Sequence, residues 1–443
     1  MRVSSGMIFD AGVSAMNRQT ASLLHLQQQI SSGRRILTPG DDPVVAARAL
    51  EVTQASDVIA QFKQNQSYAS FALGLEEVQL TSASGLLTRV RELAVQSGNA
   101  TLSASDRKSI AIELRSRFDE MLGIANATDG TGNHIFAGYM SSVTPFGGSI
   151  DDLLVGNEIV YQGDDGRRTL QVSPTRFLDV SDSGNDVFKR IKNGNGYFST
   201  DYASGNTGTG VITSGAVINP ATWNSLASKN YDIVFSADTT VAPPVTYYDI
   251  IDTDPASSNL NNSLLTGLPP VLPPTATTGQ RVFQEGQPIV LKSQGTESSF
   301  DLGASVTLTG APAEGDSFTI VPSTSQSIFV TLANLIGALE APADTPAANA
   351  KLGNEIGFAL INLDQASDNI LRIRDQIGSR MNEIESLGNL NEDINLQYQQ
   401  TLSSLQDLDY AKAISDLMRK QTDLQAAQQS FVKIAQLSLF NYL

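Results

Sequence analysis

Residues 352–384 read LGNEIGFALINLDQASDNILRIRDQIGSRMNEI, and this stretch decides the fold. Apolar or small side chains recur in it every three or four residues: Leu352, Ile356, Ala359, Leu363, Ala366, Ile370, Ile373, Ile377, Met381 and Ile384. Such a sustained pattern predicts a long amphipathic helix in coiled-coil-like packing. An ordinary antiparallel bundle produces the same stripe, so the pattern indicates architecture and not function.

The positions of proline divide the rest of the chain. Of its 17 prolines, 13 lie between Pro145 and Pro322, while residues 44–144 and the residues after Pro346 contain none. Because proline breaks a helix interior at a cost of about 3 kcal/mol, these two tracts can hold long helices. The first tract has a stripe of its own: Val58, Phe62, Ala69, Ala72, Ala83, Leu86, Val90 and Leu93.

A second helix is expected in the first tract. It should begin at Ser103, whose spacing to Asp106 fits a capping box. Asp129-Gly130 should end it. Its expected apolar face consists of Ile110, Leu114, Phe118, Leu122 and Ala125.

The middle of the chain has a different pattern. Short β-type runs, such as Glu158–Tyr161, Tyr231–Phe235 and Ser317–Val321, are separated by clusters of Gly, Asn, Asp and Pro. Gly163–Gly166 (GDDG) is expected to be a hairpin turn. Helices precede this segment and resume after it, so we predict an α+β protein in which a β-rich domain is inserted into a helical one.

The two ends carry narrower apolar stripes. Met16, Leu23 and Ile30 are seven residues apart, as are Leu417, Leu424 and Phe431 near the other end. Further members of the two stripes are Leu26, Ala427, Ile434 and Leu437. Two interpretations are open: these helices cap the bundle, or they form an assembly interface with other subunits.

Composition argues against several functions. A net charge of −17 argues against a nucleic-acid partner, and no apolar run is long enough for insertion into a membrane. The absence of cysteine excludes a disulfide scaffold and thiolate zinc sites. The first residues do not resemble a signal peptide.

No catalytic or cofactor motif stands out, so we predict a protein that is not an enzyme and has no cofactor or metal. The two histidines, His25 and His134, have no ligand-type residue at metal spacing. Asp249, Asp252 and Asp254 form the best cation candidate, but they lack the glycine and distal glutamate of a calcium loop.

Residues from both ends resemble a known family. Ile30–Ile36 (ISSGRRI), Asp41–Pro43 and Ala46–Leu50 are similar to the N-terminal signature of flagellins and hook–filament junction proteins. Asp409–Ile414 and Gln425–Phe431, with the ending Leu437–Leu443, resemble the C-terminal signature. Gly132–Tyr139 with Pro145-Phe146 resembles a segment of the FlgL-type junction proteins. The motif residues are Ser32, Gly33, Arg34, Asp41, Asp42, Pro43, Ile135, Phe136, Ala137, Gly138 and Tyr139.

The resemblance implies a layered, flagellin-like subunit of the bacterial flagellum. Residues 1–43 and 406–443 would pair as inner-core helices, 44–146 and 324–405 would form the helical bundle, and 147–323 would be the outer β-rich domain, with room for two subdomains. The implied partners are other copies in a homo-oligomeric ring, the first hook–filament junction protein, flagellin and a cytoplasmic export chaperone. The implied location is the extracellular flagellum, reached through the flagellar type III export apparatus.

Three alternatives remain. A filament-forming flagellin is the nearest, and the Gly138–Phe146 region argues against it. A flagellum-borne hydrolase would use paired carboxylates of the middle segment, although none has a distinctive spacing. A glycan-binding outer domain would use Trp223 and neighbouring tyrosines.

The short terminal stripes also predict a mechanism. Isolated helices are marginal in water, so residues 1–43 and 406–443 are expected to be mobile in a free monomer and to fold when neighbouring subunits complete the core.

Overall fold

The computed structural model describes residues 5–99, 101–240, 242–270 and 279–439. The chain forms two compact units, which are described separately below. Unit 1 comprises Met1–Ser67, Gln171–Arg176 and Ile384–Leu443, and unit 2 comprises Tyr68–Leu170 and Phe177–Glu383.

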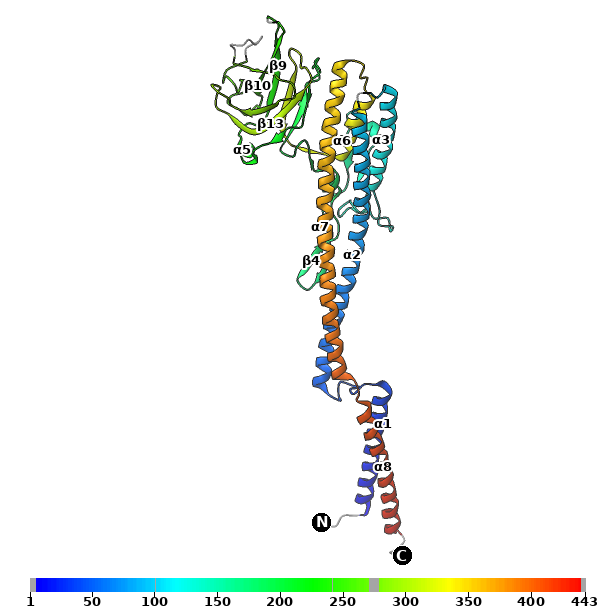
Figure 1. The fold of residues 1–443 in the computed structure, drawn as a ribbon. Coiled ribbons are helices and arrows are strands. Elements are labelled where there is room, and N and C mark those ends of the chain that lie inside the picture. Colours follow the sequence, from blue (N-terminus) through cyan, green and yellow to red (C-terminus); the bar gives the residue numbers. More distant parts are fainter. Residues whose placement is uncertain (1–4, 100, 241, 271–278, 440–443) are drawn as a thin grey trace. The chain divides into compact units, whose positions relative to one another are not determined.

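Helices occupy both proline-free tracts (Figure 1). The long helices α2 (Pro43–Ser97) and α7 (Pro346–Gln406) each begin on a proline, which suits the first helical position because it needs no N–H there. The remaining helices are α1 (Ser5–Ser32), α3 (Ala104–Ala125), α4 (Ile150–Leu154), α5 (Pro220–Ser225), α6 (Ile328–Glu340) and α8 (Tyr410–Leu439), with a π-helical turn η1 (Asn185–Lys189).

The predicted stripes are mostly inside. All members of the α7 stripe are buried except Met381, which is half-buried, and in α2 only Val58 is exposed. Ser103 caps α3 as predicted, because its hydroxyl accepts the N–H of Asp106 while the Asp106 carboxylate accepts the N–H of Ser103.

The predicted end of α3 at Asp129-Gly130 is wrong, because the helix stops at Ala125. The next residue, Asn126, exchanges two side-chain hydrogen bonds with the backbone of Phe146, at 2.9 Å each, and this diverts the chain out of the helix.

Residues 146–192 form short strands that pack on the helices. These strands are β1 (Phe146–Gly147), β2 (Val160–Tyr161), β3 (Thr169–Ser173), β4 (Arg176–Asp179) and β5 (Ile191–Lys192). Strand β2 pairs with β1, and β3 pairs with β4. The predicted hairpin turn at Gly163–Gly166 is therefore wrong, since β2 and β3 do not pair. The carboxylate of Asp164 instead accepts the N–H groups of Tyr139 and Gly166.

A β-sandwich follows in unit 2. One antiparallel sheet has the order β11-β10-β9-β14-β6, and the other has β12-β13-β7 with β8 on β13. The strands are β6 (Phe198–Tyr202), β7 (Val211–Ile212), β8 (Ala216–Val217), β9 (Tyr231–Asp238), β10 (Val245–Asp252), β11 (Arg281–Val282), β12 (Pro288–Lys292), β13 (Asp301–Thr309) and β14 (Ser317–Pro322). Side chains of both sheets share one core, which includes Phe235, Ile250, Leu291 and Leu308.

The chain enters and leaves the sandwich at one place, which we call the neck. Strand β5 pairs antiparallel with β15 (Ser325–Gln326), so that Lys192 lies opposite Ser325. The N–H of Asn193 donates to the carbonyl of Thr324 at 3.0 Å. The predicted insert 147–323 thus contains two parts: a segment that packs on the helices and a sandwich that begins at the neck.

Candidate functional site

The N-terminal signature forms a turn after α1 in unit 1. Gly33 follows the last residue of α1 with φ = +72°, a left-handed conformation that disfavours side chains. A Cβ atom on Gly33 would lie 2.9 Å from the hydroxyl oxygen of Tyr410, the first residue of α8. Glycine is therefore required both by the turn and by the close approach of the C-terminal signature.

Main-chain hydrogen bonds join this turn to the segment between α7 and α8. The N–H of Arg35 donates to the carbonyl of Gln406 at 2.7 Å, and the N–H of Leu408 donates to the carbonyl of Gly33 at 3.0 Å. The Arg35 guanidinium also donates to the carbonyl of Leu405. We call residues 33–35 and 405–410 the clasp. It is a contact between segments about 370 positions apart in sequence.

Asp41 and Asp42 stabilise the start of α2. Asp41 accepts the N–H groups of Leu37 and Thr38, each at 2.9 Å. These backbone hydrogen bonds, together with His25 at 3.1 Å, hold the pKa of the Asp41 carboxyl below its usual value. Asp42 accepts the N–H of Val45 and so caps the helix that Pro43 begins. The predicted motif residues thus build one turn and one helix start.

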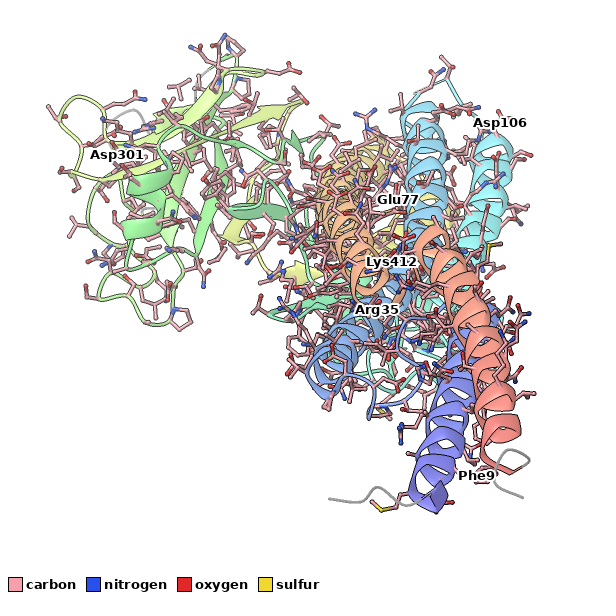
Figure 2. The ribbon with its side chains drawn as sticks, turned by 90° about the horizontal axis from the view of Figure 1, so that it is seen from below. Phe9, Arg35, Glu77, Asp106, Asp301 and Lys412 are labelled. Carbon is pink, nitrogen blue, oxygen red and sulfur yellow. The ribbon has the colours of Figure 1, made fainter. Side chains whose placement is uncertain are left out.

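The terminal helices α1 and α8 run side by side in unit 1 (Figures 1 and 2). The rings of Phe9, which Figure 2 labels, and Phe431 have centroids 5.0 Å apart. Gly12 allows this approach, because a Cβ there would lie 2.9 Å from the Phe431 ring. Lys420 donates a hydrogen bond to Ser22 across the same pair of helices.

The predicted assembly residues are buried or half-buried where their side chains are described. Leu26 is buried, and half-buried positions are Met16, Leu23, Ile30, Leu417, Leu424, Ala427 and Phe431. The side chains of Ile434 and Leu437 lie outside the described part. Phe431 of the C-terminal stripe packs against Phe9 and Gly12 of α1, so at this position the stripe makes a contact within the subunit. A neighbouring set on α8 that the stripe did not include, Ile414, Met418 and Val432, is more exposed.

The segment Gly132–Tyr139, which we call the second signature, lies in unit 2 and closes the helical core. Ile135, Phe136, Ala137 and Gly138 are buried, whereas Tyr139 is exposed. The Phe136 ring packs edge-on against Phe188, with centroids 5.2 Å apart. The Phe188 ring also contacts Phe146 and Phe329, and Phe329 contacts Phe118 of α3.

The backbone of this signature is held by polar contacts. The carbonyl of Phe136 accepts the hydroxyl of Tyr161 at 2.9 Å and the N–H of Gly184 at 2.8 Å. Gly138 has φ = +68°, and a Cβ there would lie 2.3 Å from a carboxylate oxygen of Asp164. The Nδ1–H group of His134 donates to the carbonyl of Asn126 at 2.7 Å.

A buried charge cluster attaches the segment after β4 to α2 and α7 in unit 2. Glu76 accepts the N–H of Asp182 at 3.2 Å, and Asp182 binds the guanidinium of Arg380 through both carboxylate oxygens. Burial, with the nearby Asp182 charge, raises the pKa of Glu76 well above its usual value, and its second oxygen has no partner. In the sequence, Glu76 is a polar residue among the apolar residues of the α2 stripe, and no motif indicates its partners.

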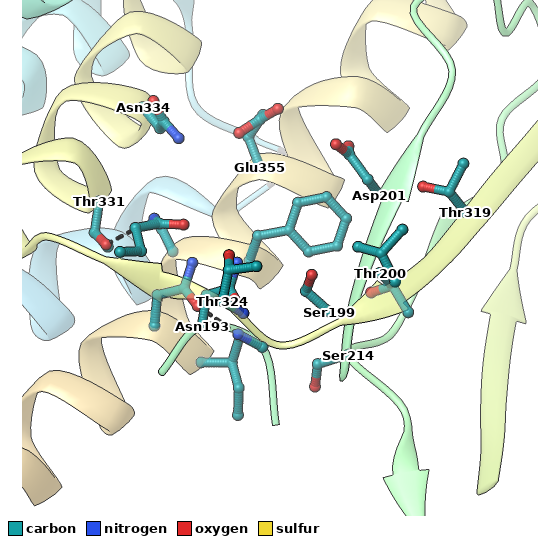
Figure 3. Close-up of a pocket in the computed structure, with 17 residues that line it drawn as sticks. Asn193, Ser199, Thr200, Asp201, Ser214, Thr319, Thr324, Thr331, Asn334 and Glu355 are labelled. Atoms are coloured by element: carbon teal, nitrogen blue, oxygen red, sulfur yellow. Dashed lines mark hydrogen bonds between the residues drawn. The ribbon is translucent and has the colours of Figure 1, made fainter. Parts of the chain in front are cut away.

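A polar cavity of about 360 Å³ lies at the neck, between α7, α6 and the sandwich (Figure 3). Glu355 of α7 and Asp201 of β6 border it, together with Asn and Thr side chains. Burial raises the pKa of Glu355, whose carboxylate accepts the Tyr202 hydroxyl at 2.9 Å. None of the lining residues is a histidine, cysteine or lysine. The lining offers hydrogen-bonding groups for water but no nucleophile–base pair.

The cation candidate does not converge on one point. Asp252 accepts the hydroxyls of Ser228 and Ser257, while Asp254 accepts the N–H groups of Lys229 and Ala256. Asp249 is bonded to a different serine, at position 263. Across the described ranges, no cluster of three or more potential ligands could hold a metal ion.

Comparison with known proteins gives the family. A family model described as the bacterial flagellin N-terminal helical region matches residues 3–141. Flagellar hook-associated protein 3 of Escherichia coli K12 is 24% identical over 445 residues, which cover 99% of each chain. The crystal structure of flagellar hook associated protein-3 from Legionella pneumophila is 30% identical, with a TM-score of 0.67, and covers 80% of this chain and 98% of that chain. The chain belongs to the FlgL family of flagellar hook-associated proteins.

Two further matches compare the similarity of this FlgL-family chain to FlgL with its similarity to flagellin. A structure of the flagellar junction protein FlgL from Legionella pneumophila, 29% identical with a TM-score of 0.67, covers 81% of this chain and 100% of that one. A flagellin of Listeria monocytogenes is 28% identical over only 29% of this chain and 45% of its own. The FlgL match therefore covers a much larger share of this chain than the flagellin match does. Within the described residues, no helix is long and apolar enough to cross a membrane.

The resemblance to the two signatures indicated Gly33, Arg35 and Tyr410 of the clasp, but not Leu405 or Gln406. Those two residues contribute backbone carbonyls, which any residue carries, so their side chains do not mark them in the sequence. The alternative of a glycan contact at Trp223 is contradicted, because Trp223 is 2% exposed and packs against Phe198 in the sandwich core.

Proposed function

We propose that this FlgL-family chain forms a homo-oligomeric ring that joins the hook, through the first junction protein, to the flagellin filament. The observation that supports the proposal best is the clasp. Its main-chain hydrogen bonds join the N-terminal signature to Gln406 and Leu408, directly before the C-terminal signature, so that both ends of the chain act together. With its two ends held together in this way, the subunit can present both terminal helices to its neighbours. Relatives of this chain are named hook-associated or junction proteins.

The terminal helices would complete their packing in the ring. The α1–α8 pair leaves Met418 63% exposed and Leu24 53% exposed. Two helices of this length bury little apolar surface by themselves, so the pair is marginal in isolation. Contacts with neighbouring subunits would cover these side chains and offset the entropy cost of ordering.

Hydrogen exchange tests this part of the proposal. In the purified monomer, amides around Leu23 and Leu424 should exchange fast, whereas those around Ile370 in the core of unit 2 should be protected. Leu424→Pro should leave the thermal unfolding of the monomer nearly unchanged and abolish incorporation, because it breaks a helix that forms on assembly. Strong protection at Leu23 and Leu424 in the monomer would show that the ends fold without neighbours.

We further propose that the chain travels through the flagellar type III export apparatus, bound beforehand by a cytoplasmic chaperone, and acts in the extracellular flagellum without enzymatic activity. Disabling the export apparatus should leave the chain inside the cell. Removal of the chaperone should lower its amount in the medium while other exported proteins remain.

A null strain tests the main proposal. It should build hooks and release unpolymerised flagellin into the medium, and the wild-type gene should restore filaments. A flagellin null is the matched comparison, because it lacks filaments for want of the building block and releases no flagellin. A null strain with normal attached filaments would contradict the proposed junction role.

A further inference from the structure

Helix α2 carries a second heptad seam in unit 2, separate from the one that faces the core. Its members follow three-and-four spacing along one side: Tyr68, Phe71, Leu75, Val78, Ser82 and Gly85. Three of these side chains are well exposed, Tyr68 at 57%, Phe71 at 62% and Val78 at 59%, and Leu75 is half-buried. We call these six residues the outer seam. Apolar residues at this spacing are what one helix presents to another in knobs-into-holes packing.

Small residues beside the large ones make the outer seam suitable for close helix contact. Gly85 belongs to the seam and Gly74 lies next to Leu75, and a Cβ on either glycine would meet nothing within 4 Å. Neither glycine is required by its own subunit. A glycine in an exposed helix interior costs about 1 kcal/mol relative to alanine, so a compensating contact would explain both.

The outer seam is uncharged in an otherwise acidic unit. Unit 2 holds 34 Asp and Glu against 18 Lys and Arg. From Tyr68 to Thr88 the charged residues are only Glu76 and Glu77. Both are used inside the subunit, because Glu76 is buried and Glu77 pairs with Arg374 at 2.6 Å.

This charge distribution points to the partner. A basic partner would bind best to acidic side chains, which unit 2 carries in excess outside the outer seam. An acidic partner would be repelled by those side chains but not by the uncharged outer seam. Another copy of this chain, with a net charge of −17, is such a partner. We infer that the outer seam of α2 is a contact surface between copies of this chain, packed against a helix of the neighbouring copy. The inference rests on the proposed ring and assigns it a surface.

Photo-crosslinking in living cells identifies the occupant. The photoreactive amino acid p-benzoylphenylalanine is placed at Val78, and at Ile112 of α3 as a control, which is 61% exposed and apolar but lies off the seam. In filament-bearing cells, Val78 should give an adduct of twice the chain mass and Ile112 should not. No adduct at Val78, an adduct with a different flagellar protein, or equal adducts at both positions would each overturn the assignment.

Complementation of the null strain separates this inference from the proposed function. Val78→Glu should lower the number of attached filaments about tenfold or more, since it places an unpaired carboxylate in a desolvated contact, and Ile112→Glu should not. Thermal unfolding of both variants should match that of the wild type, because both side chains are exposed. Full rescue by Val78→Glu would refute the seam contact and leave the junction role standing. A failure of the wild-type gene itself to rescue would refute the junction role.

Discussion

Replacement of Gly138 by alanine tests whether the second signature depends on backbone geometry. Gly138 combines a left-handed φ of +68° with a close neighbour, since a Cβ would lie 2.3 Å from the carboxylate and 2.4 Å from the carbonyl oxygen of Asp164. Gly130 is the matched control in the same region. It has φ = +82°, but a Cβ there meets nothing within 4 Å.

The expected cost has two parts. A left-handed backbone costs alanine about 1–2 kcal/mol, and both variants share this penalty. In Gly138→Ala the Asp164 carboxylate must also move, and it then loses its hydrogen bonds from the N–H groups of Tyr139 and Gly166. Hydrogen bonds to a charged group contribute about 1.5–3 kcal/mol each. Partial relaxation reduces the sum, so Gly138→Ala should cost about 2–4 kcal/mol more than Gly130→Ala.

Urea unfolding followed by the far-UV circular dichroism of the helices measures the difference. The midpoint should fall further for Gly138→Ala than for Gly130→Ala, with similar dependence on urea concentration in both. Hydrogen exchange should show that the loss of protection centres on residues 133–166. Equal destabilisation by the two substitutions would refute the reasoning, because it would mean that conformation alone, and not the contact with Asp164, requires glycine.

Three further predictions follow from other contacts. Gly33→Ala should impair rescue of a null strain, since it strains the clasp and crowds the Tyr410 hydroxyl, while Gly40→Ala in the same connection between α1 and α2 should rescue normally; equal rescue would contradict the role of the Gly33 turn. Burial raises the pKa of Glu76, so the folded state favours the protonated carboxyl group. The stability that this preference gives is fully present below the usual pKa of 4.5 and is lost as the pH rises and the buried group must ionise. Glu76→Gln should therefore stabilise the chain by about 1–3 kcal/mol at pH 7 and by little at pH 4 in urea unfolding, and an unchanged difference across that range would contradict the argument. Replacement of residues 193–324 by Asn-Gly should join β5 to β15 as a hairpin, and the exported variant should still support filaments; normal export without filaments would show that the sandwich takes part in the junction.

The sequence by itself determined the main helices and strands of this protein. Proline-free tracts and three-and-four spacing predicted α2 and α7, because proline limits a helix and a repeated stripe requires one. The capping box at Ser103 and the β-type runs at residues 231–235 and 317–321 also fold as predicted, since these patterns depend on neighbours in the chain.

Only the tertiary structure decided how these elements are used. Two polar residues of α2, Gln66 and Glu76, are buried. Each forms a hydrogen bond with the main chain of a distant segment, Gln66 with Val172 in unit 1 and Glu76 with Asp182 in unit 2. The apolar stripe in the sequence does not indicate which distant residues Gln66 and Glu76 contact. Likewise, residues 146–192 pack on the helices rather than in the sandwich, because Phe146 and Phe188 complete the helical core.

The helix faces show the same limit. Heptad spacing says which side chains share a face, but α2 has two such faces, and the sequence does not say which one is covered. Of the core-facing stripe in unit 2, the buried members include Ala83, Leu86 and Val90. Phe71 and Val78 of the outer seam remain exposed. The choice between them depends on contacts with segments far along the chain, so that periodicity determines the helix and tertiary packing determines which face is left for a partner.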